Sequence, residues 1–188
     1  MISSVSLDHL EQAWQTLMPA RPEGQPRGKA RWNEDASRDF TRDCSELATL
    51  IVQSIDSEFS APPMGHATLR LAIVMHRAFK AASLALAPLT ATDIHAILAD
   101  EEVWRARSET MPSAMLKQAE DDRIKGMPNH EILVALIGFL MDTQQARGAQ
   151  PTDATLQDLG VASHLLQITL TALNLAASRA PENARPTA

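Results

Sequence analysis

The feature that most constrains the fold is a stripe of apolar residues with helical period between residues 37 and 59. The stripe consists of Phe40, Cys44, Leu47, Ile51, Ile55 and Phe59. Side chains three or four residues apart share one face of an α-helix, whereas a half-buried strand would need strict alternation. The stripe therefore predicts a long amphipathic helix, capped by Ser37, that buries one face against the rest of the protein.

The composition extends this prediction to the whole chain. Its 188 residues include 30 alanines and 22 leucines, only seven glycines and no tyrosine. Alanine and leucine lead the helix-propensity scale, while strands favour β-branched and aromatic residues in alternation, a pattern that we do not find. We therefore predict an all-α protein.

Capping signals and breakers divide the chain into seven expected helices. Their approximate ranges are 6–18, 37–59, 66–87, 91–107, 112–125, 130–147 and 153–179. Thr90 and Asp93 form a capping-box pattern, and Thr152 or Asp153 caps the last helix, in which Gly160 should cause some irregularity. We predict a compact bundle of about six to seven helices, largely antiparallel, with the strongly apolar helix 130–147 at its centre.

The expected helices form one domain over residues 1–180, followed by a disordered tail at 181–188. Within this domain, residues 19–33 contain three prolines and two glycines and read as a linker or irregular arm after the first helix. The arm is basic in an otherwise acidic chain and carries Arg27, Lys29, Arg31 and Trp32. Arginine and tryptophan dominate binding hot spots, so the arm could hold an acidic partner or contact a nucleic-acid backbone. The alternative is that it folds back over the bundle, with Trp32 in the core.

The helix expected at 66–87 carries a second positive surface. Arg70, Arg77 and Lys80 lie with His66 on one face, and this helix contains no acidic residue. The face could bind an anion or an acidic partner. The alternative is local pairing, because an antiparallel hairpin would bring Asp39, Asp43 and Glu46 beside its end.

The sequence offers no arrangement that predicts catalysis or metal binding. It lacks the Glu-x-x-His pairs of di-iron bundles, nucleotide-binding loops and the Gly-x-Ser-x-Gly elbow. Cys44 lies in the apolar stripe and should be a buried hydrophobe. We expect the six histidines at surface or capping positions, and the acidic triplets Asp100–Glu102 and Glu120–Asp122 on solvated faces. We therefore predict no cofactor and no metal.

Charge and cysteine content bear on the compartment and on the partners. With 23 acidic and 17 basic residues, the net charge of −6 argues against a nucleic-acid-binding domain. Residues 155–174 faintly resemble a helix-turn-helix, but the segment contains no Lys or Arg to contact DNA, and we expect a core helix with a mild kink. A single cysteine leans towards a reducing compartment, and the longest wholly apolar run, 132–141, is too short to span a bilayer. We expect a cytoplasmic protein with no membrane contact.

These observations favour a non-enzymatic helical module that binds another protein through its charged surfaces and basic arm. A regulator, an inhibitor, an immunity protein or a secretion chaperone, of bacterial or phage type, would be compatible. A homodimer through helices 130–147 and 153–179 is also plausible, since an apolar helix must be buried by its own core or by a second copy. The alternative is a bundle with an internal apolar pocket, lined by methionines and phenylalanines, that binds a small ligand and could be catalytic.

Overall fold

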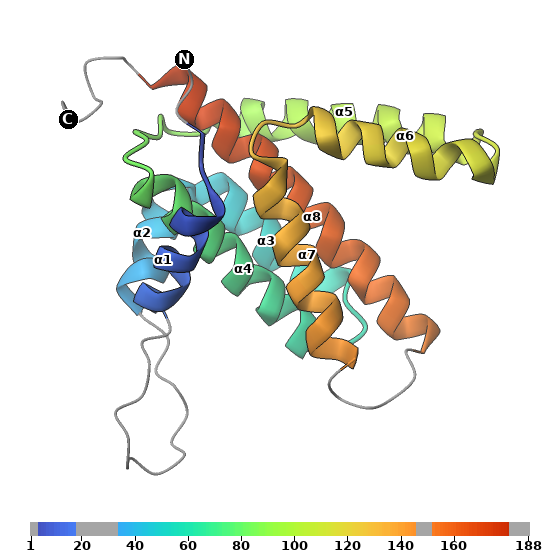
Figure 1. The fold of residues 1–188 in the computed structure, drawn as a ribbon, viewed down its shortest axis with the longest axis horizontal. Helices are drawn as coiled ribbons and strands as arrows, with labels where there is room; N and C mark the ends of the chain where they lie inside the picture. The colour runs from blue at the N-terminus through green and yellow to red at the C-terminus, as the bar shows by residue number, and fades with distance from the viewer. Residues whose placement is uncertain (1–3, 18–33, 146–151, 181–188) are drawn as a thin grey trace, which may run out of the picture.

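The computed structural model describes residues 4–17, 34–145 and 152–180, and over these residues it contains α-helices and no strand (Figure 1). The helices are α1 (Leu7–Leu17), α2 (Glu34–Asp43), α3 (Ser45–Ser57), α4 (Pro62–Ala81), α5 (Ala91–Glu109), α6 (Ser113–Gly126), α7 (His130–Gln145) and α8 (Asp153–Arg179). The all-α prediction is confirmed. The described part has eight helices instead of six to seven, because the expected helix 37–59 is divided in two.

The division between α2 and α3 falls at Cys44. Its backbone angles, φ −137° and ψ 49°, are not helical, although its N–H still donates to the carbonyl of Phe40. The predicted stripe is buried from Phe40 to Ile55, with Phe59 half-buried. Burial therefore follows the pattern across the kink. The predicted start at Ser37 is wrong, because α2 begins three residues earlier, at Glu34.

Helices α4 and α8 form the centre of the bundle, not the helix predicted at 130–147. Eleven residues of each are buried, and the two helices pack against each other behind α7 (Figure 1). In α7, Val134 and Met141 are about half exposed, although Ile132, Leu133, Leu136 and Leu140 are buried. The apolar sequence of α7 did not reveal that the helix packs at one side of the bundle.

The last helix has the predicted bounds. Of the two predicted cap residues, Thr152 is the cap, and its side chain accepts a hydrogen bond from the Thr155 N–H at 3.2 Å. The irregularity expected at Gly160 is absent, because α8 is one continuous helix through this residue. A helix-turn-helix over 155–174 is thereby excluded. By length and composition, α8 is the one described helix that could cross a membrane, yet half of its most apolar window is buried inside the bundle.

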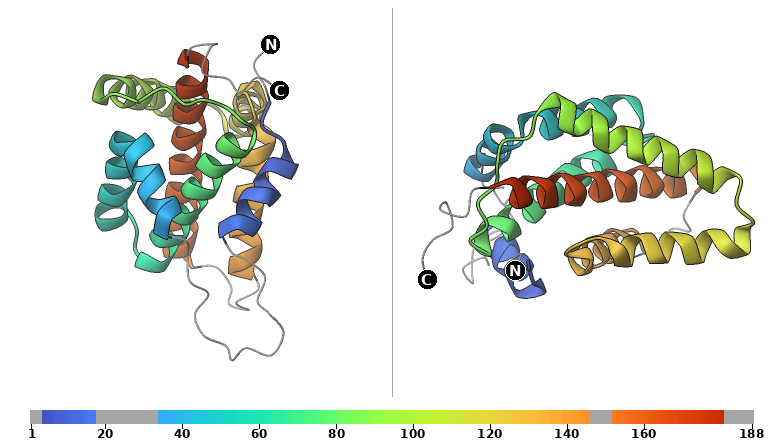
Figure 2. Two further views of the ribbon diagram at one scale, coloured as in Figure 1. Left: turned by 90° about the vertical axis from the view of Figure 1, so that its left-hand side faces the viewer. Right: turned by 90° about the horizontal axis from the view of Figure 1, so that it is seen from above.

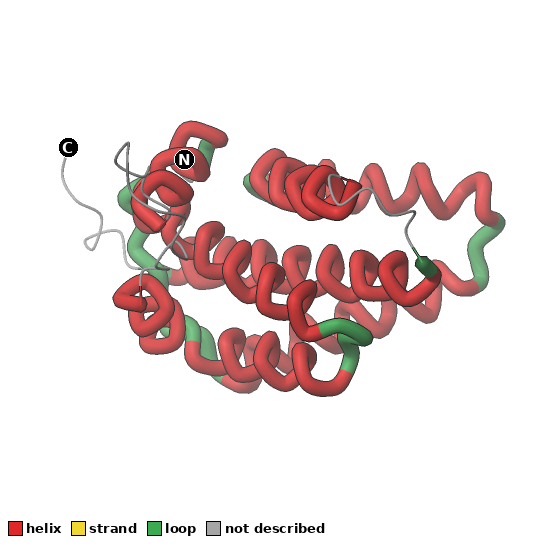
Figure 3. The backbone as a smooth tube through the Cα atoms, turned by 90° about the horizontal axis from the view of Figure 1, so that it is seen from below, coloured by secondary structure: helices red, strands yellow, loops and turns green. Residues whose placement is uncertain are grey.

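The turn between α3 and α4 is held by a residue of the last helix. Asp158, which is buried, accepts hydrogen bonds from the backbone N–H groups of Ser60 and Ala61 at 2.7 and 3.1 Å. Pro62 then opens α4 four residues before the predicted start, at a position where a helix needs no N–H donor. Figure 3 shows this connection among the short loops that join the helices.

Helices α5 and α6 extend along the top of the bundle and diverge from each other, with α8 between them in the view from above (Figures 1 and 2). The predicted capping box at Thr90 and Asp93 is confirmed, and Arg179 of α8 pairs with Asp93 at 2.6 Å. By contrast, none of the 14 residues of α6, all of which the structure describes, is buried. We call α5 and α6 together the hairpin. The hairpin is attached to α8 at the start of α5 and is loosely packed along α6.

Candidate functional site

The positive surface predicted on the helix at 66–87 lies on α4 and largely faces α2. Arg77 pairs with Asp39 at 2.9 Å, and Lys80 pairs with Asp43 at 2.8 Å. Local pairing, the alternative interpretation of this surface, is thus confirmed for these two residues. Arg70 is exposed on the same helix. The other predicted binding residues, Arg27, Lys29, Arg31 and Trp32, lie outside the described residues.

Two side chains that could in principle take part in a reaction, His76 and Cys44, are buried beside these ion pairs. His76 is completely buried, so the expectation of a surface or capping position is wrong for it. Desolvation by burial lowers the pKa of His76 to about 4, against the attraction of Asp43. Burial also raises the pKa of Cys44 to about 12, as the prediction of a buried hydrophobe implies. Both groups are neutral at pH 7 and closed to solvent, so neither is an active-site candidate.

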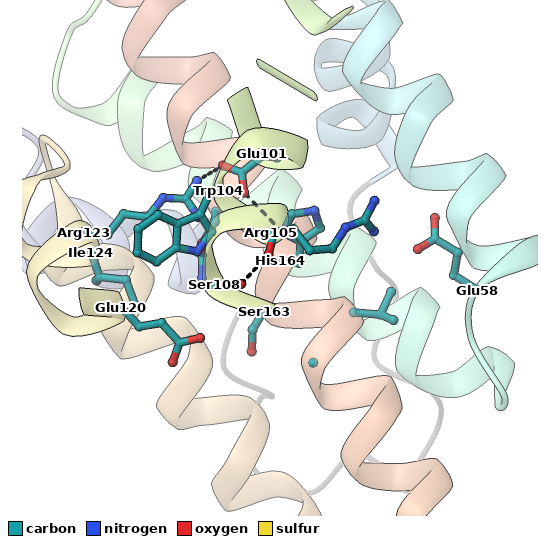
Figure 4. Close-up of a pocket in the computed structure, with 13 residues that line it drawn as sticks. Glu58, Glu101, Trp104, Arg105, Ser108, Glu120, Arg123, Ile124, Ser163 and His164 are labelled. Atoms are coloured by element: carbon teal, nitrogen blue, oxygen red, sulfur yellow. Dashed lines mark hydrogen bonds and ion pairs between the residues drawn. The ribbon is translucent and has the colours of Figure 1, made fainter. Parts of the chain in front are cut away.

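The strongest candidate site is a cleft between α5, α6 and α8, with a hollow of about 490 Å³ at its centre (Figure 4). Each helix contributes side chains at helical spacing, so that one face of each helix meets the others. The residues that line this hollow include Glu101, Trp104, Arg105, Glu120, Arg123, Gly160, Ser163 and His164. Two smaller hollows, of about 430 and 230 Å³, adjoin this one and also include Glu101. The three hollows share Glu101 and lie next to one another around the inner side of α5, and we call them together the hairpin cleft.

Glu101 is the centre of the hairpin cleft because it joins all three helices. Its side chain is 7% exposed, and its Oε1 accepts a hydrogen bond from Arg123 of α6. His164 of α8 presents Nδ1 to the other oxygen, Oε2, at 3.5 Å. This distance is within the range of an ion pair when His164 is protonated, but it is too long for a good hydrogen bond, and Oε2 has no hydrogen bond from any described residue. The carboxylate is therefore buried, paired on one oxygen and unsatisfied on the other.

Trp104 and Arg123 close the gap between the two helices of the hairpin. The Arg123 guanidinium lies over the indole ring of Trp104, 4.9 Å from its centroid, and contacts Glu101 at the same time. Such cation–π contacts are stronger where water is excluded, and here the Arg123 side chain is 23% exposed. Arg123 thus links the end of α6 to both Glu101 and Trp104 of α5.

The sequence did not predict most of this site. We expected Asp100–Glu102 to form a solvated face, which is wrong for Glu101, because this side chain is buried where three helices meet. One signal was available: Trp104 is a large aromatic residue among charged neighbours. Its partners could not be predicted, because their meeting depends on how three helices are placed in space.

The hairpin cleft is lined by charged, polar and aromatic side chains. Among the described residues, no group of three histidine, cysteine, aspartate or glutamate side chains could hold a metal ion. The cleft instead combines an aromatic face, paired charges and one unsatisfied acceptor. Comparison of the chain with protein-family models, with curated proteins and with solved structures found no match.

Proposed function

We propose that this protein is a non-enzymatic binding module that takes a segment of another polypeptide into the hairpin cleft. The observation that carries the proposal is the open groove centred on Glu101, one wall of which, α6, has no buried residue. A wall that buries nothing in the free protein can bury its inner face against an occupant. Leu116, Ala119, Arg123 and Ile124 are the partly exposed residues of that face.

The shape and lining of the cleft favour a polypeptide over a small apolar ligand. Small-molecule pockets are usually enclosed and mostly apolar with few polar groups. The three hollows of the hairpin cleft adjoin one another around α5 and open to solvent, and their described lining contains one methionine, Met127, and no phenylalanine. The alternative of an internal pocket lined by methionines and phenylalanines therefore has less support. Tryptophan and arginine, both present in the cleft, are the residue types that most often anchor protein partners.

Two predicted surfaces remain part of the proposal without structural support. The basic arm at 19–33 would bind a partner through Arg27, Lys29, Arg31 and Trp32, either together with the cleft or independently of it. A homodimer through α7 and α8 would use α7, where Val134 and Met141 are exposed on one face, more than α8, most of whose apolar residues are buried in its own core. Measurement of the solution mass tests the dimer directly.

The test of the cleft uses two substitutions at one position. Gly160 lines the cleft, and a Cβ atom built there meets no described atom within 4 Å. We expect Gly160→Trp to fold, because the new side chain enters the hollow, and to block the cleft. Gly160→Ala adds only a methyl group and is the matched control.

The measurement is binding of peptides that the full-length protein selects from a random display library. We expect selected peptides to bind the wild type and Gly160→Ala equally and to bind Gly160→Trp at least about tenfold more weakly, a loss of about 1.4 kcal/mol. Equal binding of the peptides to all three proteins would show that the binding site is not the hairpin cleft. Failure to select any peptide would contradict the proposal.

A further inference from the structure

The second oxygen of Glu101 is the least satisfied polar atom in the hairpin cleft. Arg123 donates to Oε1 (Figure 4), whereas Oε2 is buried without a hydrogen bond from any described residue. An ionised carboxylate can accept about four hydrogen bonds, and leaving a buried charged oxygen without a donor is costly. His164 Nδ1 lies 3.5 Å from Oε2 and carries a charge only when protonated. Oε2 is thus a buried acceptor at the wall of the cleft, to which no described residue donates a hydrogen bond.

The surrounding charges determine which kind of donor fits. The central hollow is lined by three carboxylates, those of Glu58, Glu101 and Glu120, and by two guanidinium groups, those of Arg105 and Arg123. With His164 neutral, these groups sum to a net charge of −1. An anion would meet the carboxylates at close range, whereas a cation would complete the pairing of Glu101.

The aromatic wall favours the same class of ligand. Trp104 already holds one guanidinium over its ring, which shows that the indole lies where a cation can approach its face. Arg123 reaches this position from α6. A cationic group of the bound ligand can therefore bind Glu101 beside Arg123, or displace Arg123 from Glu101. In either case the environment of Trp104 changes, and this change can be measured.

We infer that the hairpin cleft recognises a cationic nitrogen, a lysine ammonium or an arginine guanidinium of the bound segment, that donates to Glu101 Oε2 beside Trp104. This inference rests on the proposed function, since it names the side chain that the bound polypeptide presents. It assigns Glu101 as the specificity-determining residue and Trp104 as the aromatic wall.

The experiment uses the full-length chain labelled with 5-fluorotryptophan. The chain has three tryptophans, so fluorine NMR gives three signals, and Trp104→Phe identifies that of Trp104. The probes are n-butylammonium, butan-1-ol and butyrate, which share one alkyl chain and differ in charge, titrated at constant ionic strength. We expect butylammonium to shift the Trp104 signal to saturation, and the alcohol and the carboxylate to leave it in place.

Two variants locate the effect. Glu101→Gln keeps the shape of the side chain and removes its charge, and we expect it to weaken butylammonium binding by about tenfold or more. Asp121→Asn, an exposed site on α6 outside the three hollows, removes the same charge and should bind as the wild type does. The comparison of the three probes uses the wild type alone, so it remains decisive if Glu101→Gln fails to fold.

The outcomes separate this inference from the proposed function. No shift of Trp104, an equal shift with butan-1-ol, a shift with butyrate, or unchanged butylammonium binding by Glu101→Gln would each overturn the cation site. Peptides blocked by Gly160→Trp but insensitive to Glu101→Gln would leave the cleft as the binding site and remove Glu101 from recognition. Butylammonium binding at Glu101 without any selected peptide would support the cation site and contradict the proposed polypeptide partner.

Discussion

His76 lies where α4 packs against α2, and it is completely buried beside charged groups. Phe40 of α2 makes an edge contact with its ring, and Asp43 Oδ2 lies 3.3 Å from its Nε2. Neither ring nitrogen has a hydrogen-bond partner among the described residues. Lys80 and Arg77, on the same helix, oppose its protonation. The native state therefore holds His76 neutral, at the cost of two unsatisfied nitrogens.

This arrangement predicts a loss of stability in weak acid. The pKa of His76 falls from 6.5 to about 4 on folding, so between these values the unfolded chain binds a proton that the native state does not. The free energy of unfolding should therefore fall as the pH drops from about 6.5 to about 4, by up to about 3 kcal/mol from this residue. Denaturant unfolding at pH 7 and at about pH 4.5 measures the change.

His76→Leu isolates this contribution. The substitution removes both unsatisfied nitrogens, so the variant should be at least as stable as the wild type near pH 4.5 and should lose less stability between pH 7 and that value. His66→Leu, on the exposed side of the same helix, is the control and should behave like the wild type. If His76→Leu loses as much free energy of unfolding between pH 7 and about pH 4.5 as the wild type does, His76 does not cause the acid sensitivity.

At the scale of elements, α3 and α4 approach each other closely at Gly65. Gly65 is buried in α4, and a Cβ atom built there would lie 2.8 Å from Cγ1 and 3.0 Å from Cγ2 of Ile55. These distances are shorter than real Cβ atoms show, and the branched Ile55 side chain is itself buried. The absence of a side chain at residue 65 therefore sets how closely the two helices approach.

We accordingly expect Gly65→Ala to destabilise the protein. Overpacking costs about 1–3 kcal/mol, which exceeds the gain of about 1 kcal/mol that alanine brings to a helix. Gly160→Ala has open space and should instead raise the free energy of unfolding by about 0.5–1 kcal/mol. Chemical denaturation of both variants measures the difference, and a Gly65→Ala variant as stable as the wild type would show that α3 and α4 can move apart freely.

The elements were largely predictable where local chemistry determines them. The capping box at Thr90 and the cap at Thr152 depend on neighbouring residues, and both were read correctly from the sequence. The break at Cys44 was not, because the apolar period continues across it while only the backbone angles change. The early start of α4 at Pro62 follows from the preference of proline for the first turn of a helix, which we did not apply to this turn.

The candidate site was much less predictable than the elements. Arg77 and Lys80 were recognised as a positive face with Asp39 and Asp43 as its partners, because a short turn between helices fixes their proximity. Glu101, Arg123 and His164 lie on three helices without such a constraint. Their sequence spacing shows which face each occupies, but not which other face it meets.

At the scale of the whole molecule, the chain combines a well-packed bundle with a loosely packed hairpin. The long helix α8 serves both parts: its buried face packs on α4, and Ser163 and His164 face the hairpin cleft. Asp158 and Arg179 tie its two halves to the turn before α4 and to the start of α5. The floor of the cleft is therefore rigid, and α6 is the wall with the fewest buried contacts.

Hydrogen exchange of the full-length protein, with and without a peptide that it selects, tests this account most directly. Segments with few buried contacts open easily, so the amides of α6 should exchange fast in the free protein and those of α4 and the buried half of α8 slowly. We predict that the peptide slows exchange in α6 and in the facing turns of α5, with little change in α2. Protection confined to other helices, with α6 unchanged, would contradict the assignment of the hairpin cleft as the binding site.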